Sequence, residues 1–167
     1  MEFVEMFNNK RKPLNKTRER YDHKEGEYSQ GSHVWIMNSK GELLIQKRTP
    51  TKRLYPNLWS ITSGGTDQGE STLETACRES KEELGIDIKP EEMELMMTYK
   101  RKHDFVDVWL VRKDIDLKDI VMQEEEVAAV KWVTFDALKE MIKNGSKSSN
   151  QWFWTYRSSC IQTDVWC

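Results

Sequence analysis

A glycine-rich loop that runs directly into a strongly capped helix is the feature that most limits how this chain can fold. The loop covers residues 64–70 and has the sequence GGTDQGE. Immediately after it, Ser71 and Glu74 have the spacing of a capping box, and Gly85 stands where a left-handed residue commonly ends a helix. The sequence therefore predicts a helix over 72–84, about three and a half turns long.

Strand-like segments lie on both sides of this helix. Short apolar runs between turn residues predict strands, and these runs cover residues 33–38, 42–48, 58–62, 93–100, 104–112 and 126–133. Two pairs of these runs have the spacing of hairpins: 33–38 with 42–48, and 93–100 with 104–112. A second helix is predicted over 134–144, where Gly145 would stop it. Strands and helices in this order predict an α/β fold around one mixed sheet.

The two ends of the chain carry weaker patterns. Residues 1–27 are charged, with Pro13 as a breaker, and are expected to form a short strand followed by a loop. In the C-terminal segment 146–167, residues 146–150 are expected to form a linker-like loop and residues 151–160 a short amphipathic helix, whereas residues 162–167 have no clear pattern. Because 167 residues suit one domain, we expect a single domain over 1–167.

Composition and charge argue against several classes of function. The net charge of -2, from 26 basic and 28 acidic side chains, gives no overall field that would attract nucleic acid or an anionic membrane. No apolar run approaches the roughly 20 residues that cross a bilayer, and no export signal is visible. Cys77, Cys160 and Cys167 lack a CxxC spacing and suit a reduced compartment. We therefore expect a cytoplasmic protein with a small-molecule partner.

Three glutamates project from one side of the predicted helix. At 100° per residue, Glu79, Glu82 and Glu83 fall within roughly a quarter of the circumference. Like charges this close repel, and a divalent cation would offset the repulsion because Mg²⁺ prefers oxygen ligands. The alternative is a solvated face with ordinary ion pairs, such as Arg78 with Glu82. That alternative is the commoner one for an acidic helix taken alone.

The register of the loop and the helix resembles the Nudix box, G-x5-E-x7-R-E-U-x-E-E-x-G-U, in which U is a bulky aliphatic residue. The box covers residues 64–86, and all seven fixed positions match. With residue frequencies near about 7%, the probability of a chance match at one register is on the order of 10⁻⁸. The match is therefore far more specific than an acidic helix or a glycine loop by itself.

The resemblance implies both a fold and a reaction. Nudix proteins fold as an α/β/α sandwich with a mixed β-sheet, and they hydrolyse a diphosphate (pyrophosphate) linkage in a small nucleotide-like substrate. By this resemblance Glu79, Glu82 and Glu83 bind Mg²⁺ or Mn²⁺ and form the catalytic set with Arg78. Glu79 or Glu83 is the expected general base.

The remaining box positions are expected to be structural. By the resemblance Glu70 braces the loop together with Arg78, and Gly85 ends the helix. Ser80 departs from the pattern, because the family prefers an aliphatic residue there. Since Ser80 lies on the apolar stripe of the helix, we expect the departure to affect packing rather than chemistry. Its hydroxyl would bond a carbonyl four residues earlier. The other members of the stripe are Leu73, Ala76, Cys77 and Leu84.

Further site residues are expected outside the helix. A fourth metal ligand would come from Glu126, or from Glu124, in the acidic turn before a strand, and an exposed, solvated turn is equally consistent. Substrate phosphates would meet basic side chains before the box and the glycine backbone. For the basic cluster the alternative is a solvated hairpin end. The residues concerned are Lys47, Arg48, Lys52, Arg53, Gly64 and Gly65.

The large aromatic residues near the box are interpreted as core. Trp35, Tyr55 and Trp59 could stack on a base, but aromatic side chains in such segments are more often buried. His33 and His103 have no metal spacing, and no role is assigned to them.

A second enzyme class stays open. The stretch before the box, with GEYS at residues 26–29 and HVWIMNSKGELLIQKRTPTKRLYPNLWS at residues 33–60, resembles the Nudix subgroup related to isopentenyl diphosphate isomerase, and the similarity extends over residues 1–145. Ser63 stands where those isomerases have a catalytic cysteine, and Ser29 and Gly65 stand where they have metal-binding histidines, so hydrolysis is favoured. A non-catalytic nucleotide-binding module is the third interpretation. The substrate and the oligomeric state stay open, with a homodimer as one alternative.

Overall fold

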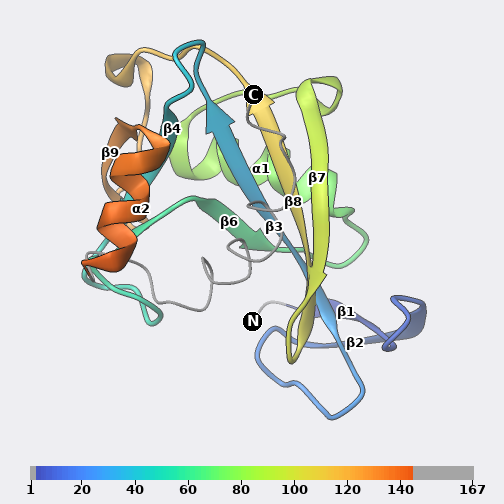
Figure 1. Cartoon of the computed structure of the whole chain (residues 1–167). Helices are drawn as coiled ribbons and strands as arrows, with labels where there is room; N and C mark the ends of the chain where they lie inside the picture. The colour runs from blue at the N-terminus through green and yellow to red at the C-terminus, as the bar shows by residue number, and fades with distance from the viewer. Residues whose placement is uncertain (1–2, 145–167) are drawn as a thin grey trace.

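A mixed β-sheet forms the centre of the structure (Figure 1), a computed structural model that describes residues 3–144. Its strands are β3 (Ser29–Met37), β4 (Leu43–Arg48), β5 (Trp59–Ser60), β6 (Thr62–Gly65), β7 (Met93–Lys100), β8 (Asp104–Arg112) and β9 (Val127–Val133). β3 and β8 are parallel, and the other pairs are antiparallel. The mixed sheet that the sequence predicts is therefore confirmed.

The sheet splits between β3 and β4. These two strands pair only at Met37 and Leu43, next to the turn that joins them. Beyond that point β6 pairs with β3, whereas β5 and β9 pair with β4. The single strand predicted over 58–62 is accordingly wrong, because the chain crosses the split at Ile61 and forms two short strands. Gly64 and Gly65, predicted to lie in a loop, end β6.

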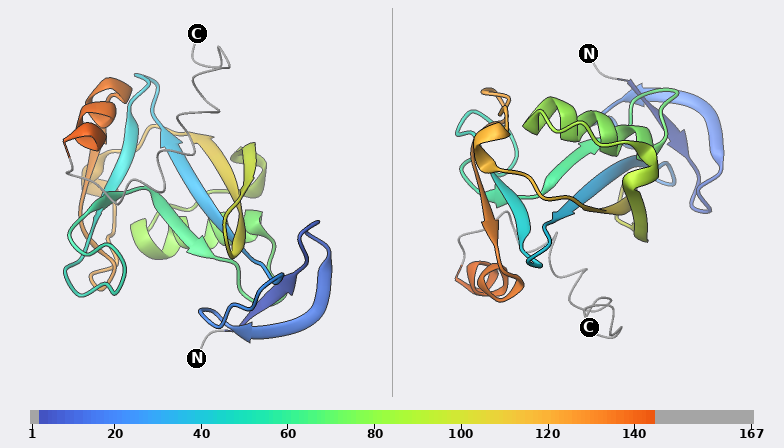
Figure 2. Two further views of the ribbon diagram at one scale, coloured as in Figure 1. Left: turned by 60° about the horizontal axis from the view of Figure 1, so that its bottom comes forward. Right: turned by 90° about the horizontal axis from the view of Figure 1, so that it is seen from above.

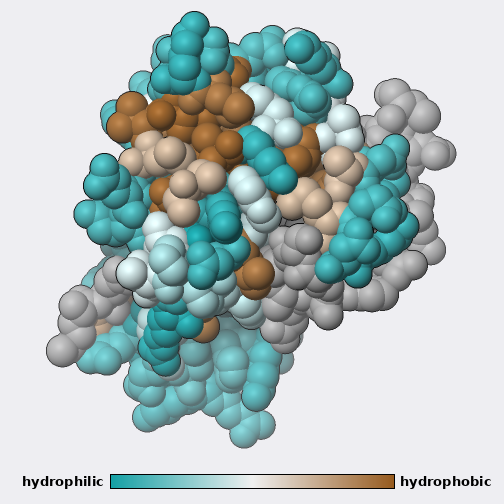
Figure 3. Space-filling view, turned by 90° about the vertical axis from the view of Figure 1, so that its left-hand side faces the viewer, coloured by the Kyte–Doolittle hydropathy of each residue, from teal (hydrophilic) through white to brown (hydrophobic). Residues whose placement is uncertain are grey.

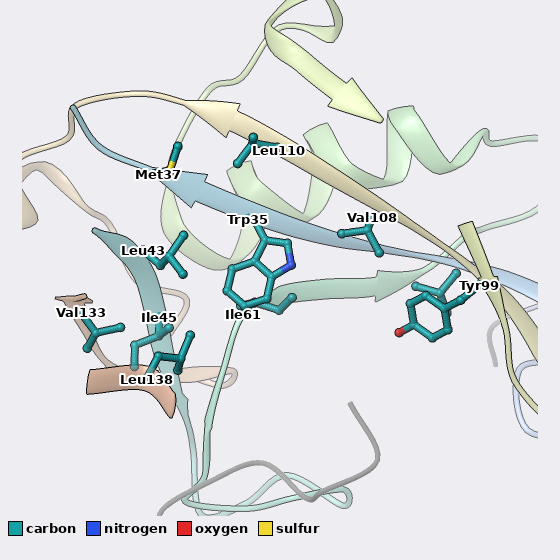
Figure 4. Close-up of a cluster of buried hydrophobic side chains, with 11 residues drawn as sticks. Trp35, Met37, Leu43, Ile45, Ile61, Tyr99, Val108, Leu110, Val133 and Leu138 are labelled. Atoms are coloured by element: carbon teal, nitrogen blue, oxygen red, sulfur yellow. The ribbon is translucent and has the colours of Figure 1, made fainter. Parts of the chain in front are cut away.

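Helices cover both faces of the sheet (Figure 2). On one face, Val34 and Ile36 of β3 pack with Ala76 of α1 (Thr72–Leu84). On the other, Trp35 of β3 and Leu138 of α2 (Phe135–Lys143) belong to one buried cluster, in which Leu138 lies next to Ile45 (Figure 4). Successive residues of a strand point to opposite faces, so one strand supplies both cores. The α/β/α arrangement expected from the resemblance is confirmed.

The ends of α1 form as the sequence predicts. The Ser71 hydroxyl accepts a 3.2 Å hydrogen bond from the backbone N–H of Glu74, and the Glu74 carboxylate accepts a 2.7 Å bond from the backbone N–H of Ser71. Gly85 closes the helix in the left-handed conformation, with φ of 68°. The Ser80 hydroxyl donates to the carbonyl of Ala76 over 2.8 Å, also as predicted.

The buried stripe of α1 differs from the predicted one. Leu73 and Cys77 are only half-buried, whereas Thr72, Thr75 and Glu83 are buried. The stripe is rotated toward the polar side because α1 packs against β3, β6 and β8 together. One of the three box glutamates therefore faces the protein interior.

The N-terminal segment forms more structure than the sequence predicts. β1 (Phe3–Phe7) and β2 (Pro13–Glu19) pair in a separate two-stranded antiparallel sheet, here called the N-terminal hairpin. The loop expected after the first strand is thus a second strand. Pro13 is its first residue, a position where a strand tolerates proline.

Shorter elements complete the described chain. Single 3₁₀ turns, η1 (Pro90–Glu92) and η2 (Leu117–Asp119), precede β7 and β9. The segment between β8 and β9 leaves Leu117, Val121 and Met122 exposed. On the side of the molecule that lies to the left in Figure 1, hydrophobic residues gather in the upper part of the surface (Figure 3). Within residues 3–144, no helix has the length and apolarity to cross a membrane. The helix expected over 151–160 lies outside the described residues.

Candidate active site

Glu83 is buried between α1 and the sheet. Its residue surface is only 3% exposed, and its Oε2 accepts a 2.8 Å hydrogen bond from Nε2 of Gln46 on β4. Burial, followed by the nearby charge of Glu79, raises the pKa of Glu83 to about 8. A solvated helix face is therefore wrong at this position, since the carboxyl lies in the interior with a neutral amide as donor.

Glu79 packs directly on Gly64 at the end of β6. A Cβ atom at Gly64 would lie 2.0 Å from Oε1 of Glu79, so only glycine leaves room for this carboxylate. The Glu79 side chain is 13% exposed. Burial raises the pKa of Glu79, although the charge of Arg78 opposes the rise.

Arg78 links two of the three box glutamates. Its Nη1 donates to Oε1 of Glu79 over 2.7 Å and to Oε2 of Glu82 over 3.0 Å. Glu82 is the most exposed of the three, with half of its side chain in solvent. Among residues 3–144, no three acidic, imidazole or thiol groups converge into a metal cluster. The structure thus gathers the glutamates on one side of α1 but joins two of them through Arg78.

The same arginine joins the helix to the glycine loop. Nε and Nη2 of Arg78 donate to the two carboxylate oxygens of Glu70 over 2.9 Å and 3.0 Å, and Nη2 donates to the carbonyl of Gly65 over 3.3 Å. Burial opposes ionisation of Glu70, but hydrogen bonds from Arg78 and Thr75 outweigh it and lower the pKa of this carboxyl. A bidentate arginine–carboxylate pair fixes both partners geometrically, so the loop is held in register with the helix.

Comparisons with known proteins give the same family as the motif in residues 64–86. A family model described as the NUDIX domain matches residues 28–153. The chain belongs to the Nudix family. An uncharacterised Nudix hydrolase of Listeria innocua is 40% identical over 114 residues, which cover 68% of this chain and 68% of that protein. The crystal structure of a Deinococcus radiodurans protein is similar in fold, with a TM-score of 0.79 at 21% identity, over 94% of this chain and 98% of that one.

One further relative bears on the isomerase alternative. The isopentenyl-diphosphate Delta-isomerase of Escherichia coli is 39% identical over 59 residues, which cover 35% of this chain and 32% of that protein. The shared stretch is short compared with the Listeria match. Nudix hydrolases are pyrophosphohydrolases, and Nudix enzymes generally use divalent metal cations.

Two loops outside the Nudix box meet at the C-terminal end of α1. The backbone N–H of Gln123 donates to the carbonyl of Glu83 over 3.0 Å, and the backbone N–H of Thr49 donates to the carbonyl of Glu126 over 3.1 Å. These bonds bring Glu126 near Glu83, whose pKa is raised by burial, by Glu79 and also by the charge of Glu126. Lys52 forms an ion pair with Glu126.

The other basic residues predicted to bind substrate lie in different parts of the structure. Arg48 lies near Glu83, where its charge opposes the rise in the pKa of that carboxyl, and its Nε donates to the carbonyl of Leu54 over 3.1 Å. Arg53 is exposed and its guanidinium lies 5.0 Å from the ring centroid of Tyr21 in the segment after β2. The structure thus brings Arg48 toward the glutamates and Arg53 toward the N-terminal hairpin. Glu124, the alternative to Glu126, is exposed, and Lys47 is half-buried.

The three aromatic residues predicted to lie in the core differ in how deeply they are buried. Trp35 is buried in the core, as predicted. Trp59 is half-buried against that core, and the ammonium group of Lys131 lies 4.2 Å from its ring centroid. The core assignment of Tyr55 is wrong, because this residue is half-buried in a loop with φ of 55°.

Gln46 is the site residue that the sequence analysis missed. It is fully buried, and its Oε1 has no hydrogen-bond partner among the described residues. A signal for it existed, because this amide directly follows the apolar run Leu43–Ile45 of β4 and precedes two charged residues. A buried amide oxygen without a partner is rare in a packed interior, and this one is available to accept a bond from a ligand or an ion.

Proposed function

We propose that this chain is a divalent-metal-dependent pyrophosphohydrolase that cleaves a diphosphate linkage in a nucleoside triphosphate or a nucleoside diphosphate-linked substrate. The observation that carries the proposal is the placement of two acidic side chains: Glu83 is buried, and Glu79, 13% exposed, packs on Gly64, which leaves no room for a Cβ atom. A buried carboxyl whose donor is a neutral amide, as in Glu83, is costly to ionise unless a cation neutralises it.

The chemistry of the carboxylate set suits a hard divalent cation, although its members do not converge into a cluster in the described structure. Glu79, Glu82, Glu83 and Glu126 offer only oxygen atoms, which Mg²⁺ and Mn²⁺ prefer, and the unpaired Oε1 of Gln46 adds a further oxygen nearby. When bound, such an ion neutralises the negative charge that develops on the diphosphate and makes water more acidic. Arg78 would keep the glycine loop and the helix in register, through Glu70 and Gly65, while the carboxylates bind the ion.

The proton of the attacking water would be accepted by one of the two buried carboxylates. Burial raises the pKa of both Glu79 and Glu83, so each has a higher proton affinity than a solvated glutamate. Attack of water on phosphorus forms the new P–O bond and breaks the bond to the bridging oxygen. The second phosphate leaves with that oxygen.

Substrate phosphates would be bound from the loop between β4 and β5. Arg48 and Lys52 lie at the edge of the carboxylate set, where their charges neutralise a polyphosphate. The backbone at Gly64 and Gly65 borders the same place from β6. Lys52 would exchange its present partner, Glu126, for a phosphate oxygen when Glu126 turns to the cation.

A substrate panel tests the proposal. The purified protein would be incubated with Mg²⁺ or Mn²⁺ and with nucleoside triphosphates, nucleotide sugars, dinucleotides and isopentenyl diphosphate, while phosphate-containing products are separated and quantified. Product formation that needs the metal and is lost in Glu82→Gln supports the hydrolase. A Glu91→Gln variant is the matched control, because Glu91 is exposed and lies outside the box. Product formation that persists in Glu82→Gln contradicts the proposed site.

An isomerase is the second candidate, favoured by the short match to the Escherichia coli isomerase. Against it, Ser63, Ser29 and Gly65 stand where the resembling isomerases have a cysteine and two histidines. Isomer formation from isopentenyl diphosphate without phosphate release would establish it. Tight nucleotide binding without any product would instead establish a binding module.

A further inference from the structure

The N-terminal hairpin lies outside the matched Nudix region, which begins at residue 28. Phe7 of β1 forms a bridge with Tyr28, just before β3, so the hairpin stands at the start of β3. In the ribbon views it lies beside the end of β6, where the glycine loop begins (Figures 1 and 2). Its sequence is thus separate from the family domain, but its position is next to the Nudix box.

An ion pair with a buried carboxylate attaches the hairpin to the domain. Arg11 donates to both oxygens of Asp107 on β8, with distances of 2.8 Å and 2.5 Å. Asp107 is only 4% exposed and also accepts a 2.5 Å hydrogen bond from Thr72, the first residue of α1. A two-pronged pair with a buried carboxylate restricts both partners, so the hairpin is fixed relative to the start of the box helix.

Arg20, directly after β2, reaches the glycine loop. Its Nη2 donates to Oδ1 of Asp67 over 2.8 Å and to the carbonyl of Gly65 over 3.3 Å. A Cβ atom at Gly65 would lie 3.0 Å from Cζ of Arg20, which means that the guanidinium packs closely against the backbone of the loop. The contact is therefore both polar and steric.

Arg78 holds the same two loop residues from the helix side. Its Nη2 also donates to the carbonyl of Gly65 over 3.3 Å and lies 3.7 Å from Oδ2 of Asp67. The loop between β6 and α1 is thus bound by two guanidinium groups, one from the box and one from the hairpin. Because Gly64 precedes this loop and supports Glu79, any displacement of the loop moves the surface on which that carboxylate rests.

We propose that Arg20 is a positioning residue of the active site, and that the N-terminal hairpin completes the Nudix box from outside the family domain. This inference rests on the proposed hydrolase function. Arg20 acts through Gly65 and Asp67, which it holds against α1, and does not need to touch the substrate. Its loss relaxes the loop and removes the fixed contact between Gly64 and Glu79.

The test compares three variants of the full chain: Arg20→Ala, Arg20→Lys and the control Arg18→Ala. Arg18 is an arginine of the same hairpin whose partners are Glu27 and Asp22. Amide hydrogen exchange over residues 63–70 is measured without metal or substrate. Steady-state kinetics are measured on the best substrate of the panel.

For Arg20→Ala we expect faster exchange over 63–70, a decrease in kcat of about tenfold and a KM within about twofold of the wild type, because a small displacement of reacting groups lowers the rate rather than the binding. Arg20→Lys should be intermediate, because an ammonium group can pair with Asp67 but does not fill the same space. Arg18→Ala should match the wild type in exchange and rate.

Three results would overturn the proposal: unchanged exchange over 63–70 in Arg20→Ala, a raised KM at unchanged kcat, or the same changes in Arg18→Ala. The second would make Arg20 a substrate contact, and the third would reduce its role to hairpin stability. If the wild type hydrolyses none of the panel, the proposed function fails. The exchange data then still decide whether Arg20 holds the loop.

Discussion

Glu83 on α1 and Gln46 on β4 share a 2.8 Å hydrogen bond in the interior of the protein. The carboxyl is almost completely buried, and its donor is a neutral amide whose own oxygen has no partner among the described residues. A buried carboxylate with so little compensation destabilises the metal-free protein. The carboxyl that the proposed reaction needs therefore lowers the folding stability of the metal-free protein.

Replacing Glu83 should raise stability while it abolishes hydrolysis. The folded-state pKa of about 8 lies above the ordinary value of 4.5, so the cost of ionising Glu83 is absent below pH 4.5, grows as the pH rises and is complete above pH 8. Glu83→Gln should thus increase the free energy of unfolding of the metal-free protein at pH 8.5, by an amount on the order of a few kcal/mol. Urea denaturation in EDTA checks this. Lower stability than the wild type at pH 8.5 would contradict the assigned burial cost.

A side chain at Gly64 should displace Glu79. The Cβ atom of Gly64→Ala would lie 2.0 Å from Oε1 of Glu79, far inside contact distance, so the carboxylate must move. We expect kcat/KM to fall by roughly 100-fold, as an ångström-scale displacement of a catalytic group does. Gly65→Ala is the comparison: its Cβ atom would lie 3.0 Å from the flexible head of Arg20 and should lower the activity less, by about the tenfold expected for loss of the Arg20 contact. Equal activities of the two variants would argue against a fixed Gly64–Glu79 contact.

The atypical Ser80 should tolerate loss of its hydroxyl but not added volume. Ser80 is completely buried, and its hydroxyl bonds the Ala76 carbonyl of its own helix. Ser80→Ala should leave activity unchanged and shift stability by less than about 1 kcal/mol, whereas Ser80→Leu should cost about 1–3 kcal/mol because it overpacks the core. Thermal unfolding of both variants decides this. A stabilised Ser80→Leu would mean that the core has unfilled space at this position.

Acidification should destabilise the fold through His33. Burial, together with the charge of Arg101, lowers the pKa of His33 well below 6.5. At neutral pH the imidazole is neutral in both folded and unfolded states, so it has no effect on stability there. As the pH falls below about 6.5 the unfolded chain binds a proton that the folded state resists, and stability decreases. The free energy of unfolding at pH 7.5 and 5.5 should therefore differ less in His33→Gln than in the wild type. An equal pH dependence would exclude His33 as the source.

The parts of the fold that follow from local interactions were predictable. The capping box of Ser71 and Glu74, the glycine end of α1 at Gly85 and the backbone bond of Ser80 each involve residues at most five positions apart. The register of the box glutamates follows from the same helix geometry. Strand positions follow from apolar periodicity, except over 58–62, where the division into β5 and β6 depends on which neighbour each half pairs with.

The sequence by itself determined the helix, its caps, the strands and the Nudix box, because periodicity, capping and motif spacing are local properties. Only the tertiary structure decided which carboxylates are buried, that Gln46 meets Glu83, that two loops bring Glu126 close, and that Arg20 reaches the glycine loop across 45 residues of sequence. These relationships join segments far apart in the chain. They depend on how the sheet, α1 and the N-terminal hairpin pack together, which no local pattern encodes.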